Sequence, residues 1–214
     1  RASIMASAGF PDAALESYDR ALALSPNPTD WLNRGALLNE LLRFEEAIAS
    51  FDKALASSPD DPAILMNRAS SLAMLERYEE VEAIYDRIIK RDPTFQQAYA
   101  LKGLAVKQMG RLAEGRALLE QALAMQPDDQ LTAYALGRLM LQTGDWRNAW
   151  PYFERRALLA EPVYVPLKHP RWSGEGPGDF RLVLVCEHGL ADTVPFCRYA
   201  SLLAGRGHAV TLLA

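Results

Sequence analysis

A spacing of about 34 residues recurs along most of the chain, and this period constrains the fold more than any other feature of the sequence. The clearest copy spans residues 30–59, where Trp31 is followed by Gly35 and then by Leu38. Three further positions keep the same period. The first position is mostly a small residue and carries Ala14, Ala47, Val81, Gly115 and Ala149. The second position is mostly aromatic and carries Tyr18, Phe51, Tyr85, Leu119 and Phe153. The third position is always proline and carries Pro26, Pro59, Pro93 and Pro127. Such a period is typical of a chain built from one repeated structural unit.

Each unit contains two stretches whose apolar residues recur at helical spacing. In one unit, Leu65, Ala69 and Leu72 belong to the first stretch, and Val81 and Ile84 belong to the second. A hairpin of two amphipathic helices cannot bury its apolar face alone, so neighbouring units must stack into a solenoid.

The helix boundaries are also marked in the sequence. Asp61 followed by Pro62 predicts an N-cap with proline at the first helical position. The recurring prolines stand where a helix must end, because proline lacks the amide donor and restrains the residue before it.

The period and the order of these residues resemble the tetratricopeptide repeat (TPR) family over about residues 1–160. The resemblance implies a mainly α fold, in which helical hairpins stack into a right-handed superhelical solenoid. We expect about four and a half to five repeats. The last repeat is expected to be atypical, because one of its sides does not face another repeat.

Composition and charge narrow the classes of function. The 214 residues are 50% hydrophobic and 23% charged, as in ordinary globular proteins. A net charge of −4 argues against nucleic acid or an anionic membrane as the partner. No apolar run approaches the roughly 20 residues needed to span a bilayer. Cys186 and Cys197 show neither a metal-ligand spacing nor a disulfide pattern, which fits a cytoplasmic protein.

No phosphate loop, metal motif or nucleophile triad is visible in the sequence, so we predict no cofactor and no metal site. The chain begins inside the expected first helix of a repeat and ends inside an apolar run. We therefore expect it to be a fragment of a larger protein.

The sequence changes character after the repeats. Residues 161–180 are rich in proline and glycine and are expected to form a linker. Residues 181–186 and 208–214 read as two strands, with a helix between Asp192 and Gly205. We therefore predict an incomplete α/β (β-α-β) unit over residues 181–214. Because a small open sheet is prone to association, we expect this unit to pack on the fifth repeat or to pair with another chain.

The concave face of the predicted solenoid is the first candidate site. Asn33 and Asn67 occupy equivalent positions in two successive units. This short asparagine ladder resembles the superhelix of the TPR-containing O-linked N-acetylglucosamine transferases, which implies that the two amides contact the backbone of a bound peptide. In the next two units the equivalent residues are Leu101 and Ala135. Solvation, or local hydrogen bonding to the helix backbone, is the alternative role for both asparagines.

The second candidate site is the turn after the first strand. With Arg171 to Gly176, this turn resembles a family of bacterial TPR proteins whose C-terminal part is a GT-B glycosyltransferase-like domain related to heptosyltransferases. The residues that match are Glu187, Gly189, Leu190, Asp192, Thr193, Phe196, Arg198 and Tyr199, whereas His188, Ala191 and Pro195 depart from the pattern. The resemblance implies that Asp192 acts as base toward an acceptor hydroxyl. The alternative is that Asp192 only caps the following helix.

These observations lead to three hypotheses for function. In the first, the chain is a TPR scaffold that binds a protein or peptide ligand in its concave groove and is itself inactive. In the second, a full-length parent is an active glycosyltransferase that uses a nucleotide-sugar, with the repeats presenting the acceptor. In the third, the C-terminal segment only caps the solenoid.

Overall fold

A computed structural model describes residues 11–155, 181–185 and 200–213 of the chain. It divides into two compact units, Arg1–Arg156 and Ala157–Ala214. We describe each unit separately. The boundaries expected at residues 160 and 180 fall in or beside a stretch outside the described residues, so they stay predictions.

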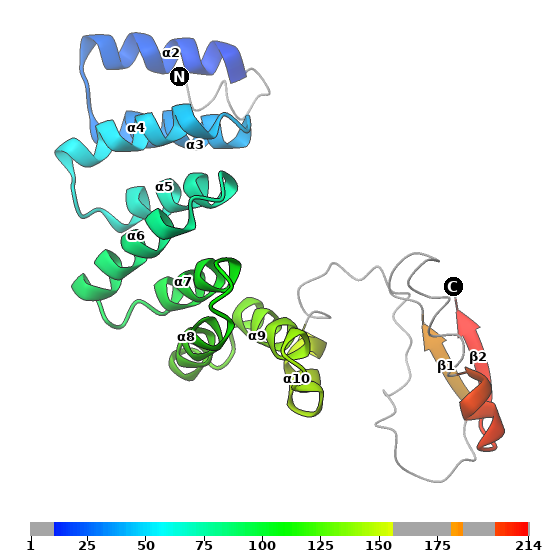
Figure 1. Ribbon diagram of the computed structural model, residues 1–214. Helices are drawn as coiled ribbons and strands as arrows, with labels where there is room; N and C mark the ends of the chain where they lie inside the picture. Colours follow the sequence, from blue (N-terminus) through cyan, green and yellow to red (C-terminus); the bar gives the residue numbers. More distant parts are fainter. Residues whose placement is uncertain (1–10, 156–180, 186–199, 214) are drawn as a thin grey trace. The chain divides into compact units, whose positions relative to one another are not determined.

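The first unit is a succession of helical hairpins (Figure 1). The helix α2 (Pro11–Leu24) comes first in the described part of the unit. The pairs that follow are α3 (Pro28–Glu40) with α4 (Phe44–Ser57), α5 (Pro62–Met74) with α6 (Tyr78–Arg91), α7 (Gln96–Gln108) with α8 (Leu112–Met125), and α9 (Gln130–Gln142) with α10 (Trp146–Phe153). Each helix packs chiefly on the helices before and after it in the chain. The predicted solenoid of stacked hairpins is confirmed.

The hairpin turns all use the same backbone geometry. The residues at the four equivalent turn positions, Leu42, Glu76, Gly110 and Gly144, have positive φ angles of 59°, 58°, 82° and 85°. In the first of these turns the Leu42 amide donates to the Asn39 carbonyl at 3.0 Å, and the Arg43 amide donates to the Leu38 carbonyl at 2.8 Å. This is the pair of hydrogen bonds of a Schellman motif, which satisfies the last carbonyls of the first helix and reverses the chain.

The helix starts agree with the caps read from the sequence. The Asp61 carboxylate accepts hydrogen bonds from the amides of Ala63 at 2.9 Å and Ile64 at 3.4 Å, and Pro62 begins α5. Asp129 caps α9 in the same way. The predicted N-cap at Asp61 is thus confirmed.

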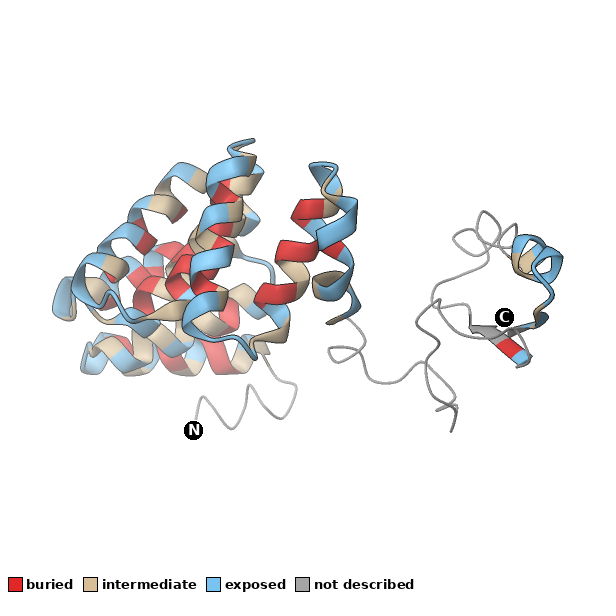
Figure 2. Ribbon diagram, turned by 90° about the horizontal axis from the view of Figure 1, so that it is seen from below, coloured by how far each residue is buried: buried red, intermediate tan, exposed pale blue. Residues whose placement is uncertain are grey.

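The core lies between the helices of successive hairpins, while their outer faces are exposed (Figure 2). Repeated positions predicted from the sequence lie at its centre: Ala47 and Phe51 are fully buried, and so is Ala54 in the same helix. Close helix contact explains the small residues. A Cβ atom added at Gly137 of α9 would lie 2.5 Å from the Phe153 amide nitrogen of α10, so no side chain fits there.

The second unit contains two parallel strands, β1 (Arg181–Val185) and β2 (Ala209–Leu213), with Arg181 opposite Ala209. Residues 200–205 between them are helical. Parallel neighbours need a crossover connection, so this is the strand-helix-strand order expected from the sequence. The predicted packing of this unit on the fifth repeat, or on another chain, stays a prediction.

Candidate functional site

An open groove of about 550 Å³ lies between α5, α6 and α7. Two of these, α5 and α7, are the first helices of successive hairpins, and α6 joins them. The groove is lined by Met66, Asn67, Ala69, Ser70, Ala73, Met74, Tyr78, Val81, Tyr85, Leu101, Leu104, Ala105 and Gln108.

Most of the groove is apolar. Met66 of α5 and Leu101 and Leu104 of α7 are half-buried, and Met74 at the end of α5 is 60% exposed. Tyr85 of α6 is buried, and this burial raises the pKa of its phenol to about 12, so the hydroxyl is neutral at physiological pH. Flexible methionines and leucines at an accessible surface adapt readily to the side chains of another molecule.

The two predicted contact asparagines have different surroundings. Asn67 lines the groove, and its side-chain amide donates to the Ala63 carbonyl one turn earlier at 2.8 Å. Asn33 is exposed on α3, in the preceding hairpin, and does not line this groove. The side-chain amide nitrogen of Asn67 is therefore partly used within its own helix, while its side-chain carbonyl oxygen accepts no hydrogen bond from the described residues.

Charged side chains form a repeated set of ion pairs between hairpins. Arg34 pairs with Asp19 at 2.7 Å, Arg68 with Asp52 at 2.7 Å, and Lys102 with Asp86 at 2.6 Å. In every case the cation lies on the first helix of one hairpin and the aspartate lies on the second helix of the preceding hairpin. These pairs join successive repeats.

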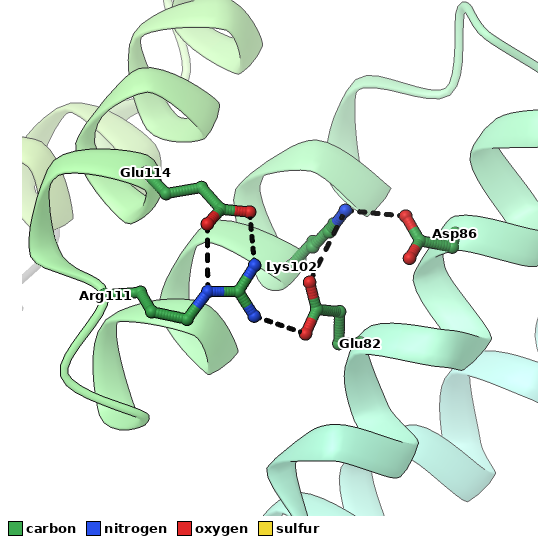
Figure 3. Close-up of polar contacts among 5 residues, drawn as sticks. All are labelled: Glu82, Asp86, Lys102, Arg111 and Glu114. Atoms are coloured by element: carbon green, nitrogen blue, oxygen red, sulfur yellow. Dashed lines mark hydrogen bonds and ion pairs between the residues drawn. The ribbon is translucent and has the colours of Figure 1, made fainter.

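The pair of Lys102 and Asp86 belongs to a larger network (Figure 3). Glu82 of α6 contacts Lys102 at 3.8 Å and accepts a hydrogen bond from Arg111 at 2.7 Å. Arg111 also donates to both carboxylate oxygens of Glu114, at 2.9 and 2.6 Å. These hydrogen bonds raise the pKa of Arg111, so its charge is permanent. The network connects α6 and α7, which line the groove, to the start of α8.

Several groove residues were not foreseen from the sequence, notably Met66, Met74, Tyr78 and Leu104. The available signal was the set of large apolar residues on α5 and α7 that do not belong to the recurring core positions.

Among the residues that the structure describes, no group of His, Cys, Asp or Glu could hold a metal ion. Asp192 lies outside the described residues, so its role stays a prediction. None of the helices described is both long and apolar enough to cross a bilayer.

Comparison with known proteins identifies relatives of the repeat unit. One family model described as tetratricopeptide repeat matches residues 40–105, and another with the same description matches residues 6–62 and 101–162. No curated protein matched the chain.

Solved structures share the fold of the repeats. A MamA fragment from Desulfovibrio magneticus RS-1 is 21% identical with a TM-score of 0.66, over 74% of this chain and 90% of that one. A second MamA structure is 19% identical with a TM-score of 0.64, over 77% and 94% of the two chains. YrrB, described as a TPR protein with an unusual peptide-binding site, is 19% identical with a TM-score of 0.59, over 74% and 82%. At these identities the likeness concerns the fold.

Proposed function

The chain belongs to the tetratricopeptide repeat family, and from this premise we propose that it is a scaffold that binds an extended peptide segment of a partner protein in the groove between α5, α6 and α7. The observation that carries the proposal is the groove itself: about 550 Å³ of open space lined mainly by apolar side chains, on helices whose other faces already pack in the core. Open apolar surface of this kind is typical of interaction sites. The peptide-binding site named for the fold neighbour YrrB supports the same function.

The groove suits an extended peptide better than a small molecule. It is open to solvent and is not an enclosed cavity. An extended backbone presents side chains alternately to its two sides, so one row can enter the groove while the other faces solvent. In this proposal the side-chain carbonyl oxygen of Asn67 accepts a hydrogen bond from the peptide backbone. Asn33 contacts a peptide that continues over α3.

The test is to block the groove without disturbing the core. Ser70 lines the groove on α5 and is exposed, so Ser70→Trp fills the space with little cost to folding. Ser57→Trp, at an exposed position at the end of α4 and outside the groove, is the matched control. Peptides are selected on the wild-type chain from a phage-displayed library of random dodecapeptides, and their binding is measured by fluorescence anisotropy.

We expect Ser70→Trp to abolish binding of the selected peptides and Ser57→Trp to leave it unchanged, with similar thermal midpoints for both variants. Equal binding by wild type and Ser70→Trp would place the peptide elsewhere and would refute the proposal.

The parallel pairing of β1 and β2 favours a second candidate role, in which the C-terminal unit opens a glycosyltransferase-like domain and Asp192 acts as base. Strand-helix-strand order is a necessary feature of such a domain and is shared by many others. The test is transfer from radiolabelled nucleotide-sugars by the longest natural form of the protein. Transfer that is lost in Asp192→Asn would support this role, and transfer that the substitution leaves intact would exclude Asp192 as the base.

A further inference from the structure

Glu82 of α6 lies beside the groove without lining it. The preceding residue, Val81, and Tyr85, three residues later, both line the groove. The ion-pair partner of Glu82, Lys102 of α7, directly follows Leu101, which lines the groove as well. The pair therefore joins α6 to α7 next to groove-lining residues of both helices.

The two carboxylate oxygens of Glu82 contact different parts of the next hairpin (Figure 3). Oε1 lies 3.8 Å from the Lys102 amine in the middle of α7, and Oε2 accepts a hydrogen bond of 2.7 Å from Arg111 in the turn before α8. The side chains of Glu82 and Lys102 are only 19% and 14% exposed, so solvent screens their attraction less than that of a surface pair. Two attachments at separate places fix the orientation of the α7 and α8 hairpin relative to α6 as well as its distance.

The same joint recurs one repeat later with the charges exchanged. Arg116 of α8 stands 34 residues after Glu82, and Asp145 stands 34 residues after Arg111. Arg116 donates a hydrogen bond to the Asp145 carboxylate at 3.0 Å. One repeat earlier this position carries Ile48, which is buried in a core cluster whose other members belong to the following hairpins. The position thus joins a second helix to the next hairpin by charge in two repeats and by apolar packing in one.

We propose that Glu82 is a positioning residue that fixes the width of the groove and so determines which size of apolar side chain a bound peptide must carry. This inference rests on the peptide-binding function proposed above. The groove-lining residues are all uncharged, so Glu82 acts on the peptide through the placement of α7 and not by contact. A groove held at one width is underfilled by a smaller side chain and overpacked by a larger one, and both cost affinity.

The test breaks this joint without leaving a cation unpaired. Glu82→Met keeps the length of the side chain and removes both contacts, while Lys102 and Arg111 retain Asp86 and Glu114 as partners. Arg111→Met breaks the joint from the other side, and the double variant Glu82→Met, Arg111→Met shows whether the two residues act together.

Two controls are matched to these variants. Glu79→Met makes the same change of charge and side chain at an exposed position of α6. Arg116→Met breaks the equivalent joint with Asp145, and neither of these residues lines the groove.

Binding is measured by fluorescence anisotropy on the complete 214-residue chain. The ligand is a selected dodecapeptide whose binding Ser70→Trp blocks. It is synthesised with alanine, valine, leucine, phenylalanine or tryptophan at the apolar position where alanine costs most affinity. Thermal midpoints of all variants show that they are folded at the temperature of the titration.

Wild type should prefer one size of side chain and bind the next smaller and the next larger one about tenfold more weakly. In Glu82→Met and Arg111→Met this preference should largely disappear, because the spacing of α6 and α7 is no longer fixed. The double variant should resemble Glu82→Met, since both substitutions break the same joint. Glu79→Met and Arg116→Met should keep the preference of wild type.

An equal loss of affinity for every side chain in Glu82→Met would show that Glu82 serves the fold alone. That result, an unchanged preference in Glu82→Met, or a wild type without any preference would overturn this inference and leave the proposed function standing. If Glu82→Met fails to fold, Arg111→Met decides, because the Arg111 side chain is 44% exposed. Absence of any selected peptide, or peptides insensitive to Ser70→Trp, would overturn both.

Discussion

Leu42 adopts a backbone conformation that suits glycine. Its φ of 59° lies in the left-handed region, and its side chain is 71% exposed. The same turn position carries Gly110 and Gly144 in later repeats. A non-glycine residue in this conformation is strained by contact between its Cβ and the following carbonyl oxygen. The turn geometry is therefore fixed by the Schellman hydrogen bonds and imposed on Leu42 by the hairpin.

We expect Leu42→Gly to stabilise the chain by about 0.5–1 kcal/mol, because relief of strain exceeds the added entropy of the unfolded chain. Glu40→Gly, at the exposed last residue of α3, is the matched control and should destabilise slightly, because there the added glycine relieves no strain. Urea denaturation of the three proteins measures both effects. A loss of stability in Leu42→Gly would show that the exposed leucine side chain makes contacts that matter.

Gly115 is a position where helix propensity and packing make opposite predictions. Propensity alone favours alanine over glycine inside a helix by about 0.5–1 kcal/mol. In α8, however, a Cβ on residue 115 would lie 2.8 Å from the Gly103 carbonyl oxygen and 3.2 Å from the Lys107 amide nitrogen of α7. These are backbone atoms, which cannot move without separating the two helices.

We expect Gly115→Ala to destabilise by about 1–3 kcal/mol, the usual cost of overpacking. Ala117→Gly, at an exposed position two residues later, tests ordinary propensity in the same helix. If Gly115→Ala were more stable than wild type in thermal denaturation, the close approach of α7 and α8 would be wrong.

At the scale of the element, Asp129 holds the start of α9. Its carboxylate accepts from the amides of Leu131 at 3.1 Å and Thr132 at 3.3 Å, from the Thr132 hydroxyl at 2.6 Å, and from the Gln96 side chain at 3.0 Å. Burial alone would raise the pKa of Asp129, but these hydrogen bonds together outweigh it and hold the pKa below its ordinary value. The cap thus links α9 to α7 through Gln96.

A carboxyl whose pKa is lowered by folding stabilises the fold above its unfolded pKa, and that stabilisation is lost as the pH falls through the folded pKa. We therefore expect Asp129→Ala to cost about 1 kcal/mol at neutral pH, the usual value for an N-cap. The difference from wild type should shrink as the pH falls below about 4. Chemical denaturation over a pH series measures this, and a difference that stayed constant would contradict the assignment. Asp128→Ala, next to the cap, controls for loss of a charge.

The elements were largely predictable because their signals are local. The N-cap of Asp61 contacts residues two and three places away, and the core position of Phe51 is set by its spacing from Ala47 and Ala54. The positive φ of Leu42 and Glu76 was not predictable from residue type, since neither is glycine or asparagine. Only the equivalence with Gly110 and Gly144 in the 34-residue period carries that information.

At the scale of the whole molecule, the groove is where sequence reasoning was least complete. Met66 and Leu104 line one surface, although they belong to different hairpins. Whether such side chains are buried or open depends on the spacing and rotation of successive hairpins, which no short motif encodes. The asparagine positions predicted a contact surface on the first helices, and one of the two, Asn67, lines the groove.

Stability in a stack of hairpins should be distributed by position, because each helix packs chiefly on its neighbours in the chain. Leu38 and Leu136 belong to separate core clusters near opposite ends of the described repeats. Both are almost completely buried, so replacing either by alanine should cost about 2–5 kcal/mol locally. We expect Leu136→Ala to lower amide hydrogen-exchange protection in α9 and α10 and, less strongly, in α8, while α3 and α4 remain protected. Leu38→Ala should give the reverse distribution. Loss of protection that is uniform over all repeats in both variants would mean that the helices unfold as one cooperative unit and that nearest-neighbour packing does not describe this chain.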